Sequence, residues 1–169
     1  MRTFVAVDLP DALADALAAL QDRFRPAEGL SFTDPGQAHV TLKFLGEVDA
    51  DRTDAVQEAI AAGVGVFPSL DYVSVVWAGF RGGGDELTRL HEGIERETTA
   101  VGFDPESHEF TPHVTLARMN DARGKDRVTR LVREEGPDVG SFAVSEVRLQ
   151  RSELTADGPR YSTVARFPL

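Results

Sequence analysis

The sequence has no cysteine and only two lysines, Lys43 and Lys125, among its 18 basic residues. Without cysteine there can be no disulfide framework, no thiolate nucleophile and no zinc–cysteine site. The formal net charge of −10 argues against a protein that holds long nucleic acid by neutralising many phosphates. A nucleic-acid substrate would therefore have to be bound locally, at one end.

Long apolar runs are also missing. The first ten residues, MRTFVAVDLP, contain only a short apolar stretch that is soon followed by charge, which is too short for a secretory signal or a membrane span. We therefore expect a cytoplasmic protein without membrane association. At 169 residues, of which 41% are hydrophobic, the chain is long enough for one well-packed core. We expect residues 1–169 to form a single two-lobed domain.

Strand-like and helix-like patterns follow one another along the chain, which indicates an α+β fold. We predict two pseudo-symmetric lobes, each with an antiparallel sheet and helices on its outer side, and an active-site cleft between the lobes. The predicted strands are residues 3–8, 38–47, 70–80, 110–119, 139–151 and 160–167. The predicted helices are residues 10–24, 49–63, 85–101 and 124–135.

The tetrapeptide His-Val-Thr-Leu occurs twice, at residues 39–42 and 113–116, once in each half of the chain. A second copy by chance has a probability on the order of one in a few hundred, so an internal repeat is the better explanation. Side chains at positions i and i+2 of a strand share a face, so the histidine and threonine of each copy project together.

Two copies facing each other would surround a pocket for one tetrahedral anion with two imidazoles and two hydroxyls. Opening a cyclic phosphate with water requires a base for the nucleophile and an acid for the departing oxygen. A neutral and a protonated imidazole, each with a pKa of about 6.5, can do both near neutral pH. We predict His39 and His113 as the catalytic pair and Thr41 and Thr115 as phosphate-binding residues, with no metal and no cofactor required.

The doubled motif resembles the two-histidine phosphoesterases, and within them the RNA 2′,3′-cyclic phosphodiesterases, also called 2′-5′ RNA ligases. FVAVDLP, HVTLKFLGE, TPHVTLAR and the segments RSEL, GPRY and FPL near the end of the chain all look like this family. The resemblance implies hydrolysis of the cyclic end of an RNA to a 2′-phosphate. It also implies that His39 protonates the leaving 3′ oxygen and that His113 activates water.

The resemblance further implies that Arg118 holds the phosphate and that Phe44 stacks on a nucleobase. Each lies five residues after its histidine, so strict alternation would point both away from the site. A β-bulge, or the end of the strand near Ala117, would turn Arg118 back. For Phe44 a place in the core is the alternative.

Other residues are given ordinary roles. His91 is expected to be a solvated helix residue, His108 a loop residue and Trp77 a core residue. Lys43 is expected at an exposed strand end, where it either contacts the RNA backbone or has no function. Tyr161 and Ser152 are expected to close one side of the cleft.

Several alternatives keep the same site. The substrate can be ADP-ribose cyclic phosphate or a nucleoside 2′,3′-cyclic phosphate, or the chain can be a module that binds RNA ends without turnover. A metal hydrolase is disfavoured because no clustered His and Asp spacing accompanies the motifs. Ligation would be the reverse reaction, and we expect it to be weak. RNA 3′ ends with a 2′,3′-cyclic phosphate are the expected partner, and a monomer is the expected state.

Overall fold

The structure is a computed structural model that describes residues 2–46, 58–68, 72–100, 102–134, 136 and 138–169. Its strands are β1 (Arg2–Asp8), β2 (Leu30–Phe32), β3 (His39–Gly46), β4 (Glu58–Pro68), β5 (Val73–Gly82), β6 (Val114–Met119), β7 (Asp138–Ala143), β8 (Glu146–Thr155) and β9 (Gly158–Pro168). Its α-helices are α1 (Ala14–Phe24), α2 (Gly84–Ala100) and α3 (Lys125–Glu134). The described 3-10 turns are η1 (Asp11–Leu13), η2 (Pro35–Gln37) and η3 (Ala122–Gly124).

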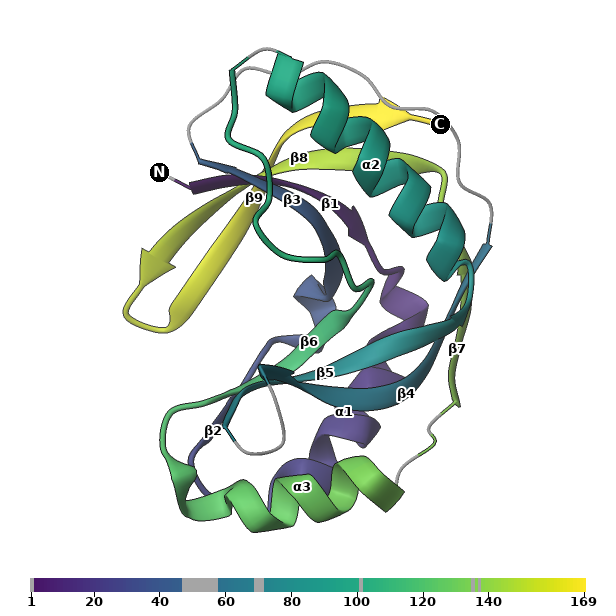
Figure 1. The fold of residues 1–169 in the computed structure, drawn as a ribbon. Helices are drawn as coiled ribbons and strands as arrows, with labels where there is room; N and C mark the ends of the chain where they lie inside the picture. Colours follow the sequence, from purple (N-terminus) through teal and green to yellow (C-terminus); the bar gives the residue numbers. More distant parts are fainter. Residues whose placement is uncertain (1, 47–57, 69–71, 101, 135, 137) are drawn as a thin grey trace.

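The strands are all paired antiparallel, in the order β7-β4-β5-β6-β3-β1-β8-β9, with β2 also paired to β6. Between β3 and β6 the pairing is reduced to one residue pair, Val40 with Val114. This point divides the molecule into a β1 lobe (β1, β3, β8, β9 and α2) and a β6 lobe (β2, β4, β5, β6, β7, α1 and α3), which curve around a central space (Figure 1). The prediction of an α+β fold with two lobes is confirmed.

The two lobes are not the two halves of the chain. In the β1 lobe the first strand, β1, lies between β3 and β8, and β8 comes from the last quarter of the sequence. Helix α1 follows β1 directly but packs against β6 and β7 of the other lobe. The sequence repeat therefore marks two equivalent strands, β3 and β6, rather than two contiguous domains.

The helices contribute buried residues at helical spacing, as their sequences predict. In α1 these are Leu17, Leu20 and Phe24, and in α2 they are Leu87, Leu90 and Ile94. Among the described residues, no helix has the combination of length and apolar character that crossing a membrane requires.

Two predicted elements are wrong. Residues 58–63, the last part of the predicted helix 49–63, form the beginning of strand β4. Residues 49–57 of that prediction lie outside the described residues. Pairing of β4 with both β5 and β7 outweighs the helical propensity of this alanine-rich stretch. The predicted strand 139–151 is divided at residues 144–145, because β7 pairs in the β6 lobe and β8 pairs in the β1 lobe.

Candidate active site

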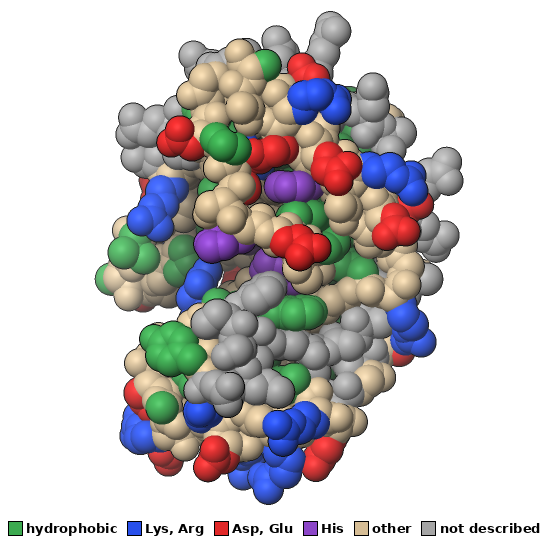
Figure 2. Space-filling model, in the orientation of Figure 1, with side chains coloured by type: hydrophobic (Ala, Val, Ile, Leu, Met, Phe, Trp, Pro, Cys, Tyr) green, Lys and Arg blue, Asp and Glu red, His purple; other side chains and the backbone are tan. Residues whose placement is uncertain are grey.

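The two His-Val-Thr-Leu copies meet where the lobes meet. The single pair that joins β3 to β6 is Val40 with Val114, the second residue of each copy. Both valines are buried, so the residues on either side of them turn to the opposite face. In an antiparallel register, position 39 then lies across from 115 and position 41 across from 113. The structure thus brings together the four motif side chains His39, Thr41, His113 and Thr115. Figure 2 shows histidine side chains beside the hollow between the two lobes.

Each motif imidazole is held in the same way by its own backbone. Nδ1 of His39 lies 2.9 Å from the carbonyl oxygen of Gln37, and Nδ1 of His113 lies 2.7 Å from the carbonyl oxygen of Thr111. Because a carbonyl only accepts, Nδ1 of each ring must carry the proton and donate it. Proton exchange with a bound molecule would then fall to Nε2 of each ring.

Aromatic side chains surround both imidazoles. The His39 ring makes an edge contact with Tyr161, at 5.0 Å between ring centroids, and lies 5.1 Å from Phe4. The His113 ring lies 6.0 Å from Trp77, which is half-buried beside the site rather than a core residue as predicted. The contact of Tyr161 with His39 agrees with its expected place at one side of the cleft.

The two imidazoles differ in the charges around them. Burial lowers the pKa of His39, while the hydrogen bond to Gln37 and the carboxylate of Asp8 oppose this effect. Burial also lowers the pKa of His113; the hydrogen bond to Thr111 opposes this, and the positive charges of His39 and Arg118 add to it. A negative charge therefore accompanies His39, and positive charges accompany His113.

Sequence reasoning missed Asp8 and the residues that hold it. Asp8 is the cross-strand partner of His39 in the β1–β3 pairing, so the two side chains share a face. Its carboxylate accepts hydrogen bonds from Arg148 Nη1 at 2.5 Å and from Gln150 Nε2 at 2.9 Å. The alternation of β1 predicts the face of Asp8, but the pairing with β8 joins residues about 140 positions apart and has no local signal.

A β-bulge follows the threonine in both copies. In the β1–β3 pairing, residues 41 and 43 face consecutive β1 residues, which leaves Leu42 as an extra residue. In the β5–β6 pairing, residues 115 and 117 face consecutive β5 residues, which leaves Leu116 as an extra residue. A bulge reverses the alternation of the strand beyond it. The fifth residue after each histidine therefore returns to the face of that histidine.

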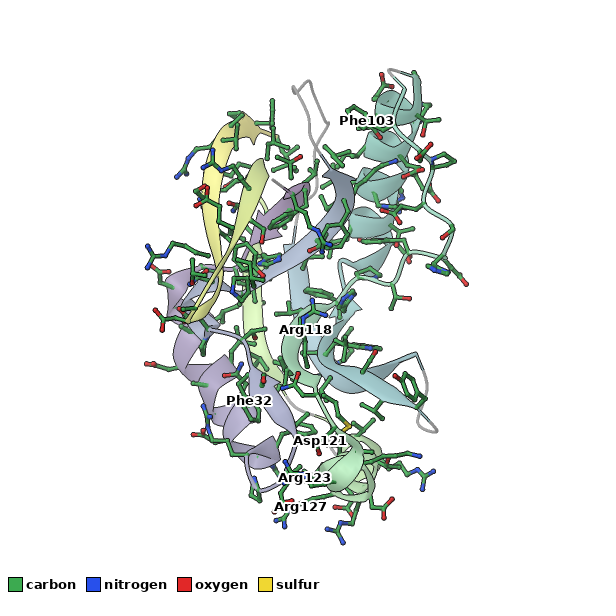
Figure 3. All side chains as sticks on the ribbon, turned by 90° about the vertical axis from the view of Figure 1, so that its left-hand side faces the viewer. Phe32, Phe103, Arg118, Asp121, Arg123 and Arg127 are labelled. Carbon is green, nitrogen blue, oxygen red and sulfur yellow. The ribbon has the colours of Figure 1, made fainter. Side chains whose placement is uncertain are left out.

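This reversal places the side chains of Arg118 and Phe44 on the same face as the motif histidines. Arg118 is exposed, and Figure 3 shows it between the upper and lower parts of the molecule. Burial raises the pKa of Tyr161 and the Arg118 charge opposes this, so the guanidinium lies near side chains of both lobes. Phe44 is 60% exposed, and its ring lies 5.8 Å from that of Phe4. Because Phe4 also contacts His39, Phe44 belongs to the face of the site and not to the core.

Lys43 is not the exposed strand-end residue that alternation predicted. It is 2% exposed, and its Nζ donates to Glu95 Oε2 at 2.6 Å and to the carbonyl oxygen of Asp104 at 3.2 Å. The bulge at Leu42 is the reason, because it turns residue 43 inward toward α2.

His91 was predicted to be solvated and is buried. Its exposure is 8%, and its ring stacks on that of Phe110 at 4.2 Å with an interplanar angle of 9°. Helical spacing alone could not distinguish this residue from its charged neighbours. His108 is exposed between α2 and β6, as predicted for a loop residue. In the part of the chain that the structure describes, no three His, Asp or Glu side chains are grouped as metal ligands would be.

Comparison with known proteins identifies the family. A model of the 2′-5′ RNA ligase superfamily matches residues 9–156. The chain belongs to this superfamily. The prediction of a two-histidine phosphoesterase, made from the doubled motif, is therefore confirmed. The residues matched to the 2′-5′ RNA ligase superfamily include both strands of the site, β3 and β6.

Two named proteins resemble the chain over most of its length. An Aeropyrum pernix protein named RNA 2′,3′-cyclic phosphodiesterase is 43% identical in an alignment of length 138 that covers 75% of this chain and 78% of that protein. A Methanothermobacter thermautotrophicus protein of the same name is 34% identical and aligns with 100% of this chain and 99% of its own length.

Solved structures show the same fold. The protein TT0787 of Thermus thermophilus has a TM-score of 0.79 and 30% identity, covering 100% of this chain and 98% of its own. The complex of E. coli LigT with 3′-AMP has a TM-score of 0.80 and 26% identity, covering 99% and 97%.

Proposed function

We propose that the chain hydrolyses RNA 2′,3′-cyclic phosphate ends to 2′-phosphates by paired histidine acid–base catalysis. The observation that carries the proposal is the meeting of His39 and His113, each with Nδ1 bound to its backbone, on one surface between the lobes. The relatives named RNA 2′,3′-cyclic phosphodiesterase support this substrate class.

In the proposed reaction, Nε2 of His113 takes a proton from water as the water oxygen attacks phosphorus. The bond from phosphorus to the 3′ oxygen breaks, and that oxygen receives a proton from Nε2 of His39. The surrounding charges support this division of work. Asp8 favours the charged form of His39, whereas the charges of His39 and Arg118 favour a neutral His113.

The remaining predicted residues are assigned to the substrate. Thr41 and Thr115 donate hydrogen bonds to the non-bridging phosphate oxygens, whose charge has to be stabilised in the transition state. Arg118 adds a charge-assisted bond to the same phosphate. Phe44 offers an exposed ring on the His39 side of the site, where the terminal nucleobase can stack.

Three further possibilities are outcomes of the same test. A small cyclic nucleotide or ADP-ribose cyclic phosphate would use the same acid and base, and a binding module would retain the RNA end unchanged. Weak 2′-5′ joining would replace water by a 5′ hydroxyl. The chain has an exposed aromatic residue for a terminal base, which favours a nucleotide end over a phosphate without a base.

The test is to incubate the protein separately with an oligoribonucleotide that ends in a 2′,3′-cyclic phosphate, alone and with a second RNA that has a 5′ hydroxyl, with nucleoside 2′,3′-cyclic phosphates and with ADP-ribose cyclic phosphate, and to identify the products. The expected result is a 2′-phosphate end, which a nonspecific phosphatase removes and a 3′-specific phosphatase does not. A 3′-phosphate end would show that the bond from phosphorus to the 2′ oxygen breaks instead. An unchanged end bound by the protein would show a binding module, and turnover only of small cyclic nucleotides would restrict the substrate.

A further inference from the structure

A buried polar side chain from a helix holds the extra residue of each bulge. The carbonyl oxygen of Leu42 accepts a hydrogen bond from Nδ1 of His91 on α2 at 2.6 Å. The carbonyl oxygen of Leu116 accepts one from Nε2 of Gln21 on α1 at 2.9 Å. Both donors are buried, at 8% exposure for His91 and 1% for Gln21. The two lobes thus use different residue types for the same contact.

These contacts meet a need that the bulges create. The extra residue of a bulge interrupts the ladder, and its buried carbonyl still needs a donor. The Leu42 carbonyl is bonded to the His91 side chain, whereas the Leu116 carbonyl has a backbone donor, Thr33, to which the Gln21 amide is added. Regular pairing without an extra residue would require no donor from behind the strand. A side-chain donor at this carbonyl therefore favours the bulged backbone over the regular one.

The two carbonyl oxygens differ in the number of donors described for them. Leu116 also accepts from the backbone N–H of Thr33 at 3.0 Å and from its hydroxyl at 3.0 Å. His91 supplies the described side-chain donor to Leu42, and its ring also stacks on Phe110, which precedes the second motif. The bulge in β3 should therefore depend on its helix donor more strongly than the bulge in β6.

We propose that His91 and Gln21 are equivalent positioning residues, each holding one bulge so that the fifth residue after a motif histidine faces the site. His91 acts on Phe44 through Leu42, and Gln21 acts on Arg118 through Leu116. Without the bulges, alternation would direct both of these side chains toward the core. The inference rests on the proposed function for the roles of Phe44 and Arg118, but its structural part stands independently.

The proposal is tested with His91→Leu and Gln21→Leu, which remove the donor, and His91→Gln, which supplies the amide donor that the other lobe uses. Thr88→Val is the matched control, because it removes a part-buried side-chain hydrogen bond of α2, from Thr88 Oγ1 to the carbonyl of Gly84, that does not involve a bulge. Two probes separate the effects. Inhibition by inorganic phosphate reports on Arg118, and the rate ratio between a cyclic phosphate end with its base and one without reports on Phe44.

His91→Leu is expected to reduce the base-dependent rate ratio by about tenfold, the order of one base–aromatic stack, with little change in phosphate inhibition. Gln21→Leu is expected to weaken phosphate inhibition by roughly three- to tenfold, as for a partly displaced charge-assisted contact, and to leave the base ratio unchanged. His91→Gln should restore most of the base ratio, and Thr88→Val should resemble the wild type. Equal losses on both probes in both variants, or no rescue by His91→Gln, would overturn the proposal.

Hydrogen exchange supplies a readout that does not need turnover. Amide exchange in residues 42–45 should rise in His91→Leu, and in residues 116–118 it should rise in Gln21→Leu, each without the other. If the wild type has no activity on cyclic ends, the proposed function fails while this pattern still decides the positioning role. Unchanged exchange at both bulges would refute it.

Discussion

The ion pair between the buried Lys43 and the half-buried Glu95 predicts which of two substitutions lowers the free energy of unfolding more. The Lys43 side chain is 1% exposed and that of Glu95 is 22% exposed, with 2.6 Å between Nζ and Oε2. Glu95→Gln leaves a buried ammonium without its counter-charge, which typically costs about 3–5 kcal/mol. The Asp104 carbonyl and the new amide oxygen still accept from Nζ, so we expect about 3 kcal/mol.

Lys43→Met should cost less. Glu95 can turn toward water and keeps its hydrogen bond from the backbone N–H of Glu106, at 2.8 Å, while methionine fills much of the volume that the lysine stem leaves. We expect a loss of about 1 kcal/mol, and the double variant should resemble Lys43→Met. For a chain of this length, a difference of about 2 kcal/mol between the single variants corresponds to roughly 4–8 °C in Tm.

Urea and thermal unfolding, followed by far-UV circular dichroism, measure both values. The effect should also depend on pH. Burial would raise the pKa of Glu95, but the bonds from Lys43 and Glu106 lower it below its usual value. The charged pair thus stabilises the fold above the unfolded pKa of glutamate, about 4.3, and this stabilisation is lost as the pH falls through the lower folded value. If Glu95→Gln is as stable as Lys43→Met at pH 7, the ion-pair reasoning is wrong.

Three further predictions concern catalysis. Replacing either His39 or His113 by Ala should lower kcat by about 10²–10⁴-fold, and the double variant should be little worse than the worse single one; multiplicative losses would indicate independent contacts. The pH profile of kcat/KM should be bell-shaped with its maximum below about 6.5, because burial lowers the pKa of both imidazoles and the proposed mechanism needs a neutral His113 and a charged His39; a maximum above about pH 6.5 would contradict this assignment. Activity should survive excess EDTA, and a loss that a divalent ion restores would show that the proposed mechanism is incomplete.

The sequence was most informative where chemistry is local. The repeated tetrapeptide predicted that His39 and Thr41 share a face, and likewise His113 and Thr115, because two-residue alternation in a short strand needs no knowledge of the rest of the fold. The meeting of the two copies depends on the pairing of β3 with β6. The same alternation predicted the wrong face for the residues after Leu42, because it takes no account of an inserted residue. An inserted residue changes the face of every later side chain, and nothing in the letters that follow marks the insertion.

Other features depend on partners far along the chain. The burial of Lys43 requires a carboxylate on α2, and the place of Asp8 beside His39 is reinforced by an arginine on β8. Similarly, residues 58–63 have helix-forming composition, but β5 and β7 pair with them on both sides. Tertiary pairing of this kind outweighs local propensity and is not visible in a window of ten or fifteen residues.

The interleaving of the two lobes bears on how the protein is made and how it can be divided. During synthesis β1 leaves the ribosome before the other described strands, yet its neighbour β8 follows only after β2 to β7. The β1 lobe therefore cannot complete its sheet until β8 and β9 have also been released, and fragments that end before β8 will expose an unpaired strand edge in the meantime. For the same reason, a cut between β3 and β6 would separate the strands of both lobes. Complementation by two such fragments should require them to fold together rather than to dock as finished halves.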